Sequence, residues 1–370
     1  MFAGQLEDHL EELAHHYSRS DNVAKAVEYL GRAGQQAMQR SAYADAINRL
    51  TAGINLLKRL PDSPERFQRE LLLQLDLGRP LIAVKGYAAP EVERAYTRAR
   101  ELCRRIGDTG EVFPATQGLW AFYLLRGQCK EAHEFAKEVF TLAERTKDST
   151  LLMQGHFGLG NDLLWLGEFE TARIHLEQAI KLYDPSQHRS SQILAINSGV
   201  FFWGFLGHVL WYLGYPDQAM KASSTAVVLA SEPYQPYSLA FARLFSAWLH
   251  QYRTESLACR ALVESNITLS TEQGFAFELA QAKVLRGWAL SQQGEVSDGI
   301  AGIREGIAAY RGTGAELESL HWLSLLAGAC AKAELFEEAE GALGEALSQV
   351  QESGARFCEA ELYRLKGELI

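Results

Sequence analysis

The sequence predicts an all-α protein, built as a right-handed superhelix of stacked antiparallel helical hairpins with a repeat period of about 40 residues. Pairs of small residues twelve positions apart recur along the chain, and the later pairs begin 39 to 47 residues apart. Only nine prolines occur in 370 residues, which favours long helices because proline breaks a helix interior. Hydrophobic residues make up 47% of the chain, enough for a large buried core.

Each pair marks one predicted hairpin, and we call the first member, which lies in the first helix, the anchor. The pairs are Gly160/Ala172, Gly207/Ala219, Ser246/Ala258, Gly287/Gly299 and Ala327/Ala339, and Ala14/Ala26 and Trp120/Ala132 fit the same spacing. Small residues allow the two helix backbones to approach closely. Seven positions after four of the anchors stand Gly127, Gly167, Gly214 and Gly294, which predict left-handed turns at the helix ends. Because one hairpin cannot bury both of its faces, neighbouring hairpins must stack.

This arrangement resembles the tetratricopeptide repeat (TPR). The resemblance rests on a small residue at the eighth place, alanine at the twentieth, a large apolar residue such as Leu176 at the twenty-fourth, and alanine such as Ala179 at the twenty-seventh. The period here is nearer 40 than the usual ~34, so longer helices or connections are expected. The predicted division is residues 1–60 as N-terminal TPR-like helices and residues 61–370 as a TPR-like array. The last repeat, which begins around Gly367, is expected to be truncated.

Several segments are similar to the TPR tails of large bacterial signalling ATPases. They are LAHHY (13–17), KGYAAPEVERAYTRARELC (85–103), GNDLLWLGEFETAR (160–173), HLEQAIKLYD (175–184) and LGYPDQA (213–219). Proteins of that family carry a P-loop ATPase module upstream of the tail, and often a class III adenylate or guanylate cyclase domain. The resemblance implies that the tail senses a partner or ligand and controls the upstream module. This sequence itself contains neither an ATPase module nor a cyclase domain.

Composition, cysteine spacing and segment length argue against nucleic-acid and membrane partners and favour a cytoplasmic location. The 36 Lys and Arg against 46 Asp and Glu give a net charge of −10, whereas a nucleic-acid binder needs a basic surface to neutralise phosphates. Five scattered cysteines without a CxxC pair, together with a polar N-terminus, predict reduced thiols in a cytoplasmic protein. The apolar segment 199–215 is short for a membrane span and fits the first helix of a repeat, so no membrane association is expected.

Catalytic motifs are absent from the sequence. It contains no GxxxxGK[ST] P-loop, no GxSxG nucleophile elbow and no HExxH zinc motif, so neither enzyme activity nor a cofactor is expected. His9 and His16 share a helix face, with His15 beside them. A transition-metal site is conceivable there, and a partly exposed helix is the simpler interpretation.

Candidate binding residues follow from the repeat frame, because the first helices of stacked hairpins line the concave surface. Residues just after each anchor and three to four positions further on, with polar residues of the same helices, are expected to face a groove. They are Asn161, Trp165, His208, Trp211, Tyr212, Arg243, His250, Gln251, Trp288, Gln292 and His321. Aromatic and hydrogen-bonding groups together suit a protein, a peptide or a small ligand, although tryptophans are also common in helical cores. Arg243, His208 and Gln251 are the stronger candidates, because polar groups on an apolar face need partners.

The sequence leads to one main functional hypothesis and two alternatives. The main one is a non-catalytic sensing module that binds a protein or ligand in its groove and regulates an attached signalling ATPase or nucleotide cyclase. The first alternative is a free-standing TPR adaptor that joins proteins. The second is an enzyme with its site in the groove, which requires clustered acids, bases or nucleophiles that the sequence does not show.

Overall fold

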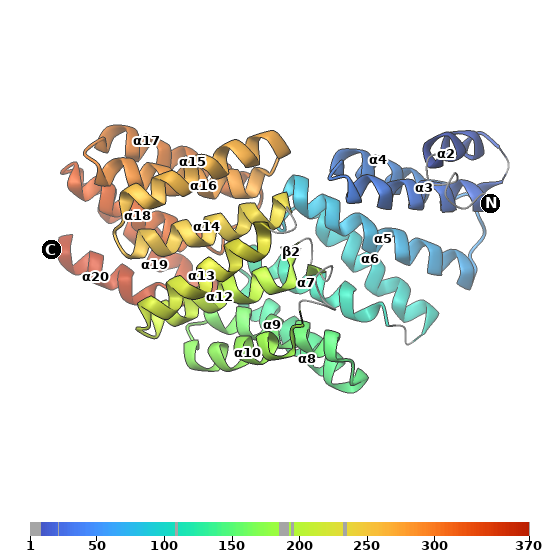
Figure 1. Cartoon of the computed structure of the whole chain (residues 1–370), viewed down its shortest axis with the longest axis horizontal. Helices are drawn as coiled ribbons and strands as arrows, with labels where there is room; N and C mark the ends of the chain where they lie inside the picture. Colours follow the sequence, from blue (N-terminus) through green and yellow to red (C-terminus); the bar gives the residue numbers. More distant parts are fainter. Residues whose placement is uncertain are drawn as a thin grey trace. The chain divides into compact units, whose positions relative to one another are not determined.

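The structure of the chain is a computed structural model, and it describes residues 9–20, 22–107, 110–184, 192–193, 196–231 and 235–369. Apart from one pair of two-residue strands, the secondary structure of these residues is helical (Figure 1). This confirms the predicted all-α fold class of stacked antiparallel hairpins. Contacts divide the chain into two compact units, of which the first holds residues 1–84 and 89–119 and the second holds residues 85–88 and 120–370. The division after residue 60 and the truncated last repeat stay predictions.

The first unit is built from the helices α2 (Leu10–Ser18), α3 (Val23–Gln39), α4 (Tyr43–Leu57), α5 (Pro64–Lys85), α6 (Pro90–Ile106) and the start of α7 (Val112–Leu125). Leu71, Leu102 and Cys103 are fully buried where α5 packs against α6. An ion pair joins the same two helices, because Nε of Arg98 lies 2.6 Å from Oε1 of Glu70. The core of this unit is therefore local to neighbouring helices, as stacked hairpins require.

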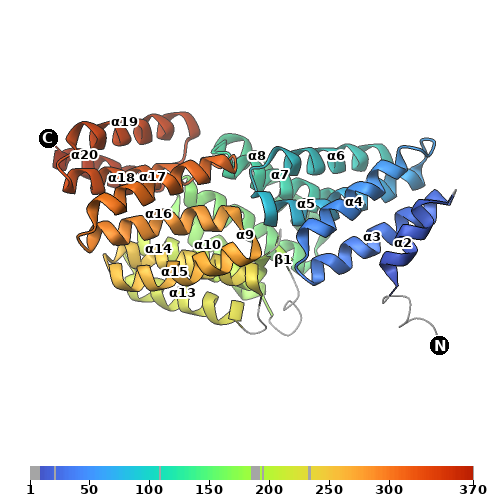
Figure 2. The same cartoon turned by 90° about the horizontal axis from the view of Figure 1, so that it is seen from above.

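The second unit contains the rest of the array. Its elements are α8 (Cys129–Thr146), α9 (Ser149–Trp165), α10 (Phe169–Leu182), β1 (Gln192–Ile193), β2 (Ile196–Asn197), α12 (Ser198–Tyr212), α13 (Pro216–Ser231), α14 (Pro236–Tyr252), α15 (Ser256–Gln273), α16 (Ala276–Gln292), α17 (Val296–Gly312), α18 (Ser319–Lys332), α19 (Phe336–Ser353) and α20 (Glu359–Leu369). The strands pair antiparallel, with Ile193 opposite Ile196. The first helices of successive hairpins, from α9 through α12, α14, α16 and α18 to α20, pack side by side in one layer, and the second helices form the other layer (Figures 1 and 2).

The close helix approaches expected at the anchors are present. A Cβ atom added at Gly160 would lie 2.8 Å from Cγ of Leu176 and 3.2 Å from the carbonyl oxygen of Ala172. At Gly287 an added Cβ would lie 2.6 Å from the carbonyl oxygen of Gly299. These contacts join the anchor to residues twelve and sixteen positions later, so the repeat frame read from the sequence is correct in these hairpins.

One hairpin is out of register by one residue. The spacing predicts a pair of Ser246 and Ala258, but Ala258 is only half-buried, whereas Ala247 and Cys259 are both fully buried. Thr254, seven positions after Ala247, has a φ of 58° at the turn where other hairpins carry glycine. The true pair is therefore Ala247/Cys259. Two adjacent small residues and a turn without glycine concealed this register in the sequence.

The four predicted turn glycines adopt the left-handed conformation. Gly127, Gly167, Gly214 and Gly294 have φ angles of 72°, 83°, 83° and 94°. A residue with a side chain is strained at such an angle, so glycine suits these helix ends. The same turns connect α7 to α8, α9 to α10, α12 to α13 and α16 to α17, as the repeat frame requires.

The second unit curves until repeats far apart in sequence touch. The carbonyl oxygen of Leu125, at the end of α7, accepts hydrogen bonds of 2.8 and 3.2 Å from the backbone amides of residues 316–317. The carbonyl oxygen of Trp165, at the end of α9, accepts bonds of the same two lengths from the amides of residues 356–357. The segments that precede α18 and α20 therefore dock onto the ends of α7 and α9, and the first helices between them enclose an interior.

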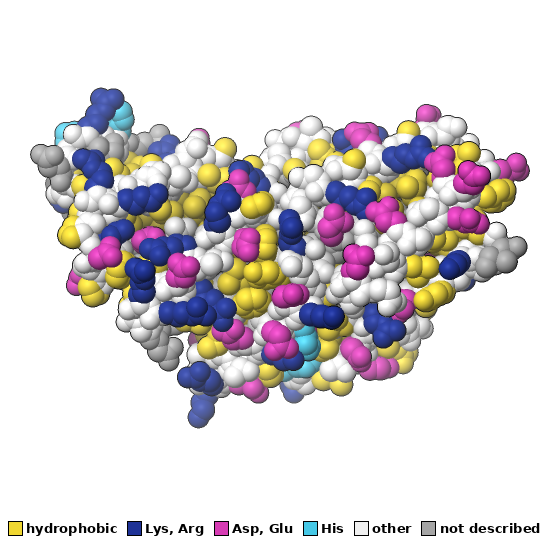
Figure 3. Space-filling view, turned by 180° about the vertical axis from the view of Figure 1, so that it is seen from behind, with side chains coloured by type: hydrophobic (Ala, Val, Ile, Leu, Met, Phe, Trp, Pro, Cys, Tyr) yellow, Lys and Arg dark blue, Asp and Glu magenta, His cyan; other side chains and the backbone are white. Residues whose placement is uncertain are grey.

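No helix in the described part of the chain is long and apolar enough to cross a membrane. This includes α12, which holds most of the apolar segment 199–215. On the face shown in Figure 3, basic and acidic side chains are interspersed, and no continuous basic strip crosses it.

Candidate functional site

A groove of about 1060 Å³ lies in the second unit along the C-terminal ends of the first helices. We call it the large groove. Its walls come mainly from α12, α14, α16, α18 and α20 and from the segment that precedes α20, with further residues from α10 and α19. The aromatic, polar and charged residues that line it include Phe169, Trp211, Tyr212, Gln251, Tyr252, Trp288, Gln292, His321, Lys332, Arg356, Phe357, Glu361, Arg364 and Glu368.

The repeat frame explains why these side chains meet. Residues one, four and five positions after an anchor lie on one helix face, because those spacings match the helical period. The residues so placed are Trp211 and Tyr212 after Gly207, Gln251 and Tyr252 after Ala247, Trp288 and Gln292 after Gly287, and Gly328, Ala331 and Lys332 after Ala327. Each stacked hairpin thus contributes equivalent positions to one continuous surface.

The structure distributes the eleven candidate residues over three places. Trp211, Tyr212, Gln251, Trp288, Gln292 and His321 line the large groove. Asn161 and Trp165 line a second, smaller cavity. His208, Arg243 and His250 line neither. The misread register accounts for His250, because counting from Ala247 puts Gln251 and Tyr252 at the groove positions.

His208 has partners within the core. It is almost fully buried, and its Nε2 lies 3.1 Å from the carbonyl oxygen of Phe245. Burial lowers the pKa of His208 to about 4, although the bond to the Phe245 carbonyl opposes this shift. The neutral ring also packs edge-on against Trp248, at a centroid distance of 5.1 Å. This polar side chain on an apolar helix therefore has its hydrogen-bond partner inside the core.

Stacked aromatic rings form the floor of the large groove. Phe169 stacks on Tyr212 with ring centroids 4.6 Å apart, and Trp211 stacks on Tyr252 at 5.5 Å, both with an interplanar angle of 8°. The hydroxyl groups of Tyr212 and Tyr252 are hydrogen-bonded to each other, which ties the two pairs together. Such mutual contacts hold the rings in place, so the floor is formed before any ligand arrives.

Polar side chains bridge neighbouring repeats beside this floor. Nε2 of His321 on α18 lies 2.9 Å from Oε1 of Gln251 on α14, and Nζ of Lys332 donates to Oε1 of Gln292 on α16. Burial, and secondarily repulsion from His208 when that ring is protonated, lowers the pKa of His321 to about 3. The imidazole is therefore neutral at physiological pH, and Nε2 donates its proton to the amide oxygen of Gln251.

Charged residues of α20 and of the segment before it form another wall of the groove. Arg364 pairs with Glu361 at 2.6 Å and with Glu368 at 2.5 Å, and Arg356 pairs with Glu359 at 2.8 Å. Because Arg364, Glu361 and Glu368 are exposed, the pairs that Arg364 makes exchange readily with water. The groove thus offers an apolar floor and a wall that carries both charge signs.

Eight of the fourteen lining residues named above were missed from the sequence, and four of them show why. Lys332 and Tyr252 both lie five positions after an anchor, so the repeat frame identifies Lys332 as it stands and Tyr252 once the register is counted from Ala247. Phe357 and Arg364 come from the segment that docks onto α9 and from the helix that follows it. Their position depends on a contact between distant repeats, for which the sequence carries no local signal.

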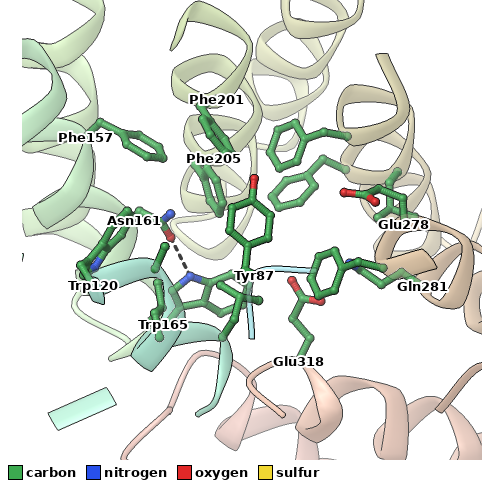
Figure 4. A pocket seen from close by; sticks show the side chains of 17 residues that line it. Tyr87, Trp120, Phe157, Asn161, Trp165, Phe201, Phe205, Glu278, Gln281 and Glu318 are labelled. Carbon is green, nitrogen blue, oxygen red and sulfur yellow. Dashed lines mark hydrogen bonds between the residues drawn. The ribbon is translucent and has the colours of Figure 1, made fainter. Parts of the chain in front are cut away.

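The second cavity, of about 50 Å³, lies deeper in the same unit, and we call it the aromatic cavity (Figure 4). Nε1 of Trp165 donates to Oδ1 of Asn161 at 2.6 Å, so these two candidate residues satisfy each other. Three further polar residues face the cavity, Glu278, Gln281 and Glu318. Its aromatic lining is Tyr87, Trp120, Phe157, Trp165, Phe201, Phe205, Phe241, Phe245 and Phe277.

One cluster outside both cavities combines residue types found in cysteine nucleophile sites. His133 Nδ1 lies 2.6 Å from Oδ2 of buried Asp162, and Cys129 lies one helical turn before His133. Burial, and secondarily the charge of Asp162, raises the pKa of Cys129 to about 12. The thiol is fully buried and stays protonated, so it lacks the thiolate that nucleophilic chemistry requires.

The described residues contain no group of three or more His, Cys, Asp or Glu side chains arranged to hold a metal ion. His9 lies 2.9 Å from Oε2 of Glu12, which gives the first of the N-terminal histidines a partner within its own helix turn. All five cysteines are buried and unpaired with one another.

Sequence comparisons with known proteins identify one relative and no family. No established family profile matches the chain. An uncharacterized protein of Rhizobium meliloti (strain 1021) is 24% identical over 367 residues. The match covers 96% of this chain and 35% of that protein, so the chain spans about a third of its relative's length.

Solved structures are similar over most of the chain. A Rap protein complexed with Competence and Sporulation Factor has a TM-score of 0.61 at 11% identity and covers 93% of this chain and 98% of its own. The Rap conjugation gene regulator of plasmid pLS20, in complex with the Phr* peptide, has a TM-score of 0.62 at 14% identity, over 79% of this chain and 75% of its own. The chain has a TPR-like helical-repeat fold.

A third solved structure joins this fold to a signalling ATPase. It is a Signal Transduction ATPase with Numerous Domains (STAND) protein with a TPR sensor, from Pyrococcus horikoshii. Its TM-score is 0.50 at 13% identity, and the match covers 87% of this chain and 49% of that protein. At these identities the likeness shows the TPR-like fold alone.

Proposed function

We propose that this chain is a non-catalytic TPR-like sensing module, which binds a peptide or small ligand in the large groove and regulates an attached signalling ATPase or nucleotide cyclase. The observation that carries the proposal is the groove itself. Its volume of about 1060 Å³ is at the upper end for small-molecule sites, so it has room for an extended segment rather than a single small metabolite.

The chemistry of the groove supports peptide recognition. Aromatic rings such as Trp211 supply contact area at low entropic cost, because they are already held by stacking. Exposed polar groups such as Lys332 and Arg364 are available to a peptide backbone or to charged side chains. One structural neighbour is complexed with the Phr* peptide, which agrees with this use of the fold.

Two comparisons support attachment to a longer protein. The Rhizobium meliloti relative is about three times as long as the matching segment, and the STAND protein carries its TPR sensor next to an ATPase. The sequence similarity to TPR tails of bacterial signalling ATPases points to the same arrangement. Regulation then requires that the ligand favour one of two states of the attached module, since a ligand shifts an equilibrium only by its differential affinity.

The coding sequence that flanks this chain is the first test. An upstream in-frame nucleotide-binding motif is expected, and its absence favours the free-standing adaptor. In the longer protein, a peptide selected on the large groove should change ATP hydrolysis by about fivefold or more, a usual size for allosteric coupling. Trp211→Ala should abolish that response, and Arg243→Ala, which lies outside both cavities, should preserve it. Equal responses in the two variants contradict the proposal.

A further inference from the structure

Three hydrogen-bond acceptors in the aromatic cavity have no partner. They are Oε2 of Glu278, Oε1 of Gln281 and Oε2 of Glu318. These residues are 2%, 1% and 3% exposed, and all three line the cavity. Figure 4 shows the two carboxyl groups pointing toward the space around Tyr87. Buried polar atoms are usually satisfied, so three such atoms at one cavity call for an explanation.

The cavity wall contains no cation that could satisfy these acceptors. None of its seventeen lining residues is Lys, Arg or His. Beyond the wall, two tyrosines approach the carboxyl groups: Tyr237 of α14 lies beside Glu278, and the hydroxyl of Tyr310 on α17 accepts a 3.2 Å hydrogen bond from the backbone amide of Glu318. When the two carboxyl groups are ionised, the site presents acceptors and negative charge, so a complementary ligand brings donors and positive charge.

The remaining wall is aromatic, which also favours a cation. Nine rings line the cavity, and the negative face of an aromatic ring attracts a positive charge within about 6 Å. Tyr87 and Phe277 meet edge to face beside the carboxyl groups, with centroids 5.9 Å apart. A cavity of about 50 Å³ has room for roughly four non-hydrogen atoms, at 10–15 Å³ for each water-sized position.

We propose that the aromatic cavity binds the head group of a compact organic cation, an alkylammonium or guanidinium ion, which donates hydrogen bonds to Glu278, Gln281 and Glu318. The ligand's charge pairs with the two carboxylates, and its apolar carbon atoms contact the surrounding rings. This site is separate from the large groove, so the proposal goes beyond the function proposed for that groove.

The ionisation of the two carboxyl groups gives the proposal a measurable signature. Burial raises the pKa of Glu278 to about 7 and that of Glu318 to about 8, and the charge on Glu278 adds to the second shift. At pH 7 without a cation, the Glu278 carboxyl is therefore about half protonated and the Glu318 carboxyl is largely protonated. A bound cation stabilises the ionised forms, so binding must release protons and must strengthen as pH rises toward about 8.5.

Titration calorimetry on the intact chain tests this directly. The probes are propylammonium and methylguanidinium chlorides, and the neutral controls are n-propanol and N-methylurea. At least one cation should bind saturably at about pH 8.5, about tenfold more tightly than at about pH 6.5, with proton release seen by comparing two buffers of different ionisation heat. The neutral analogues should not bind. Trp120 and Trp165 line the cavity, so tryptophan fluorescence should follow the same titration.

Variants assign the binding to this cavity. Glu278→Gln and Glu318→Gln keep the side-chain size and should each weaken cation binding tenfold or more. Glu272→Gln, on the exposed face of α15, should leave it unchanged. The proposal is overturned if the folded wild-type chain binds neither cation below about 10 mM, if the neutral analogues bind equally well, or if both cavity variants bind like the wild type.

Discussion

Gly287→Ala is expected to lower the free energy of unfolding by about 2–3 kcal/mol. The added Cβ would lie 2.6 Å from both the carbonyl oxygen of Gly299 and the amide nitrogen of Ile303. Both contacts are with backbone, so α16 and α17 would have to move apart instead of a side chain rotating away. Urea unfolding followed by circular dichroism measures the change.

Gly344→Ala is the matched control, because Gly344 lies in a helix where an added Cβ meets nothing within 4 Å. This variant should gain about 0.5–1 kcal/mol, the usual helix preference for alanine over glycine. If Gly287→Ala is as stable as wild type, the anchors are not close backbone contacts and the repeat frame loses its physical basis.

The double variant Glu278→Gln, Glu318→Gln is expected to be more stable than wild type at alkaline pH, with little difference at acid pH. In the unfolded chain both carboxyls ionise near pH 4.5, whereas the folded chain holds their protons until pH rises through about 7 and about 8. The folded state therefore binds more protons in that window, and its stability falls as pH rises through it. The loss contributed by the pair between about pH 5.5 and 8.5 is on the order of 5 kcal/mol.

Unfolding free energies at several pH values in this range, measured for wild type and double variant, isolate the contribution of the pair. The difference between the two proteins should grow with pH and level off above about pH 8. Glu272→Gln, at an exposed carboxyl, should follow the wild-type curve. A constant difference across the range would mean that the two carboxyl groups are not protonated in the folded chain.

The repeat frame could be read from the sequence because its signal is local. Gly160 and Ala172 must both be small for two helices to touch, and Gly167 must turn between them, so three positions within one hairpin specify its geometry. Where that signal is ambiguous, the prediction slipped. Ser246 and Ala247 are both small, and Thr254 occupies the turn in place of glycine.

The sites were less predictable because they depend on distant repeats. Phe357 reaches the large groove only because its backbone amide bonds to the carbonyl of Trp165, nearly two hundred positions earlier. Glu278 and Glu318 read as ordinary helix-end acids in the sequence, and only the packed aromatic rings around them show that they are buried. The sequence therefore identified residues that lie on an inner helix face. It did not show which of those residues remain accessible in the folded chain.

The affinity of the large groove for a peptide tests the central claim most directly. A random peptide library panned on this chain should yield binders, and their Kd should rise tenfold or more, by about 1.4 kcal/mol or more, in Trp211→Ala and in Lys332→Ala. Arg243→Ala should bind with the wild-type Kd. Two results contradict the assignment of the groove as the recognition site. In the first, the library yields no binders; in the second, the selected peptides bind the groove variants with the wild-type Kd.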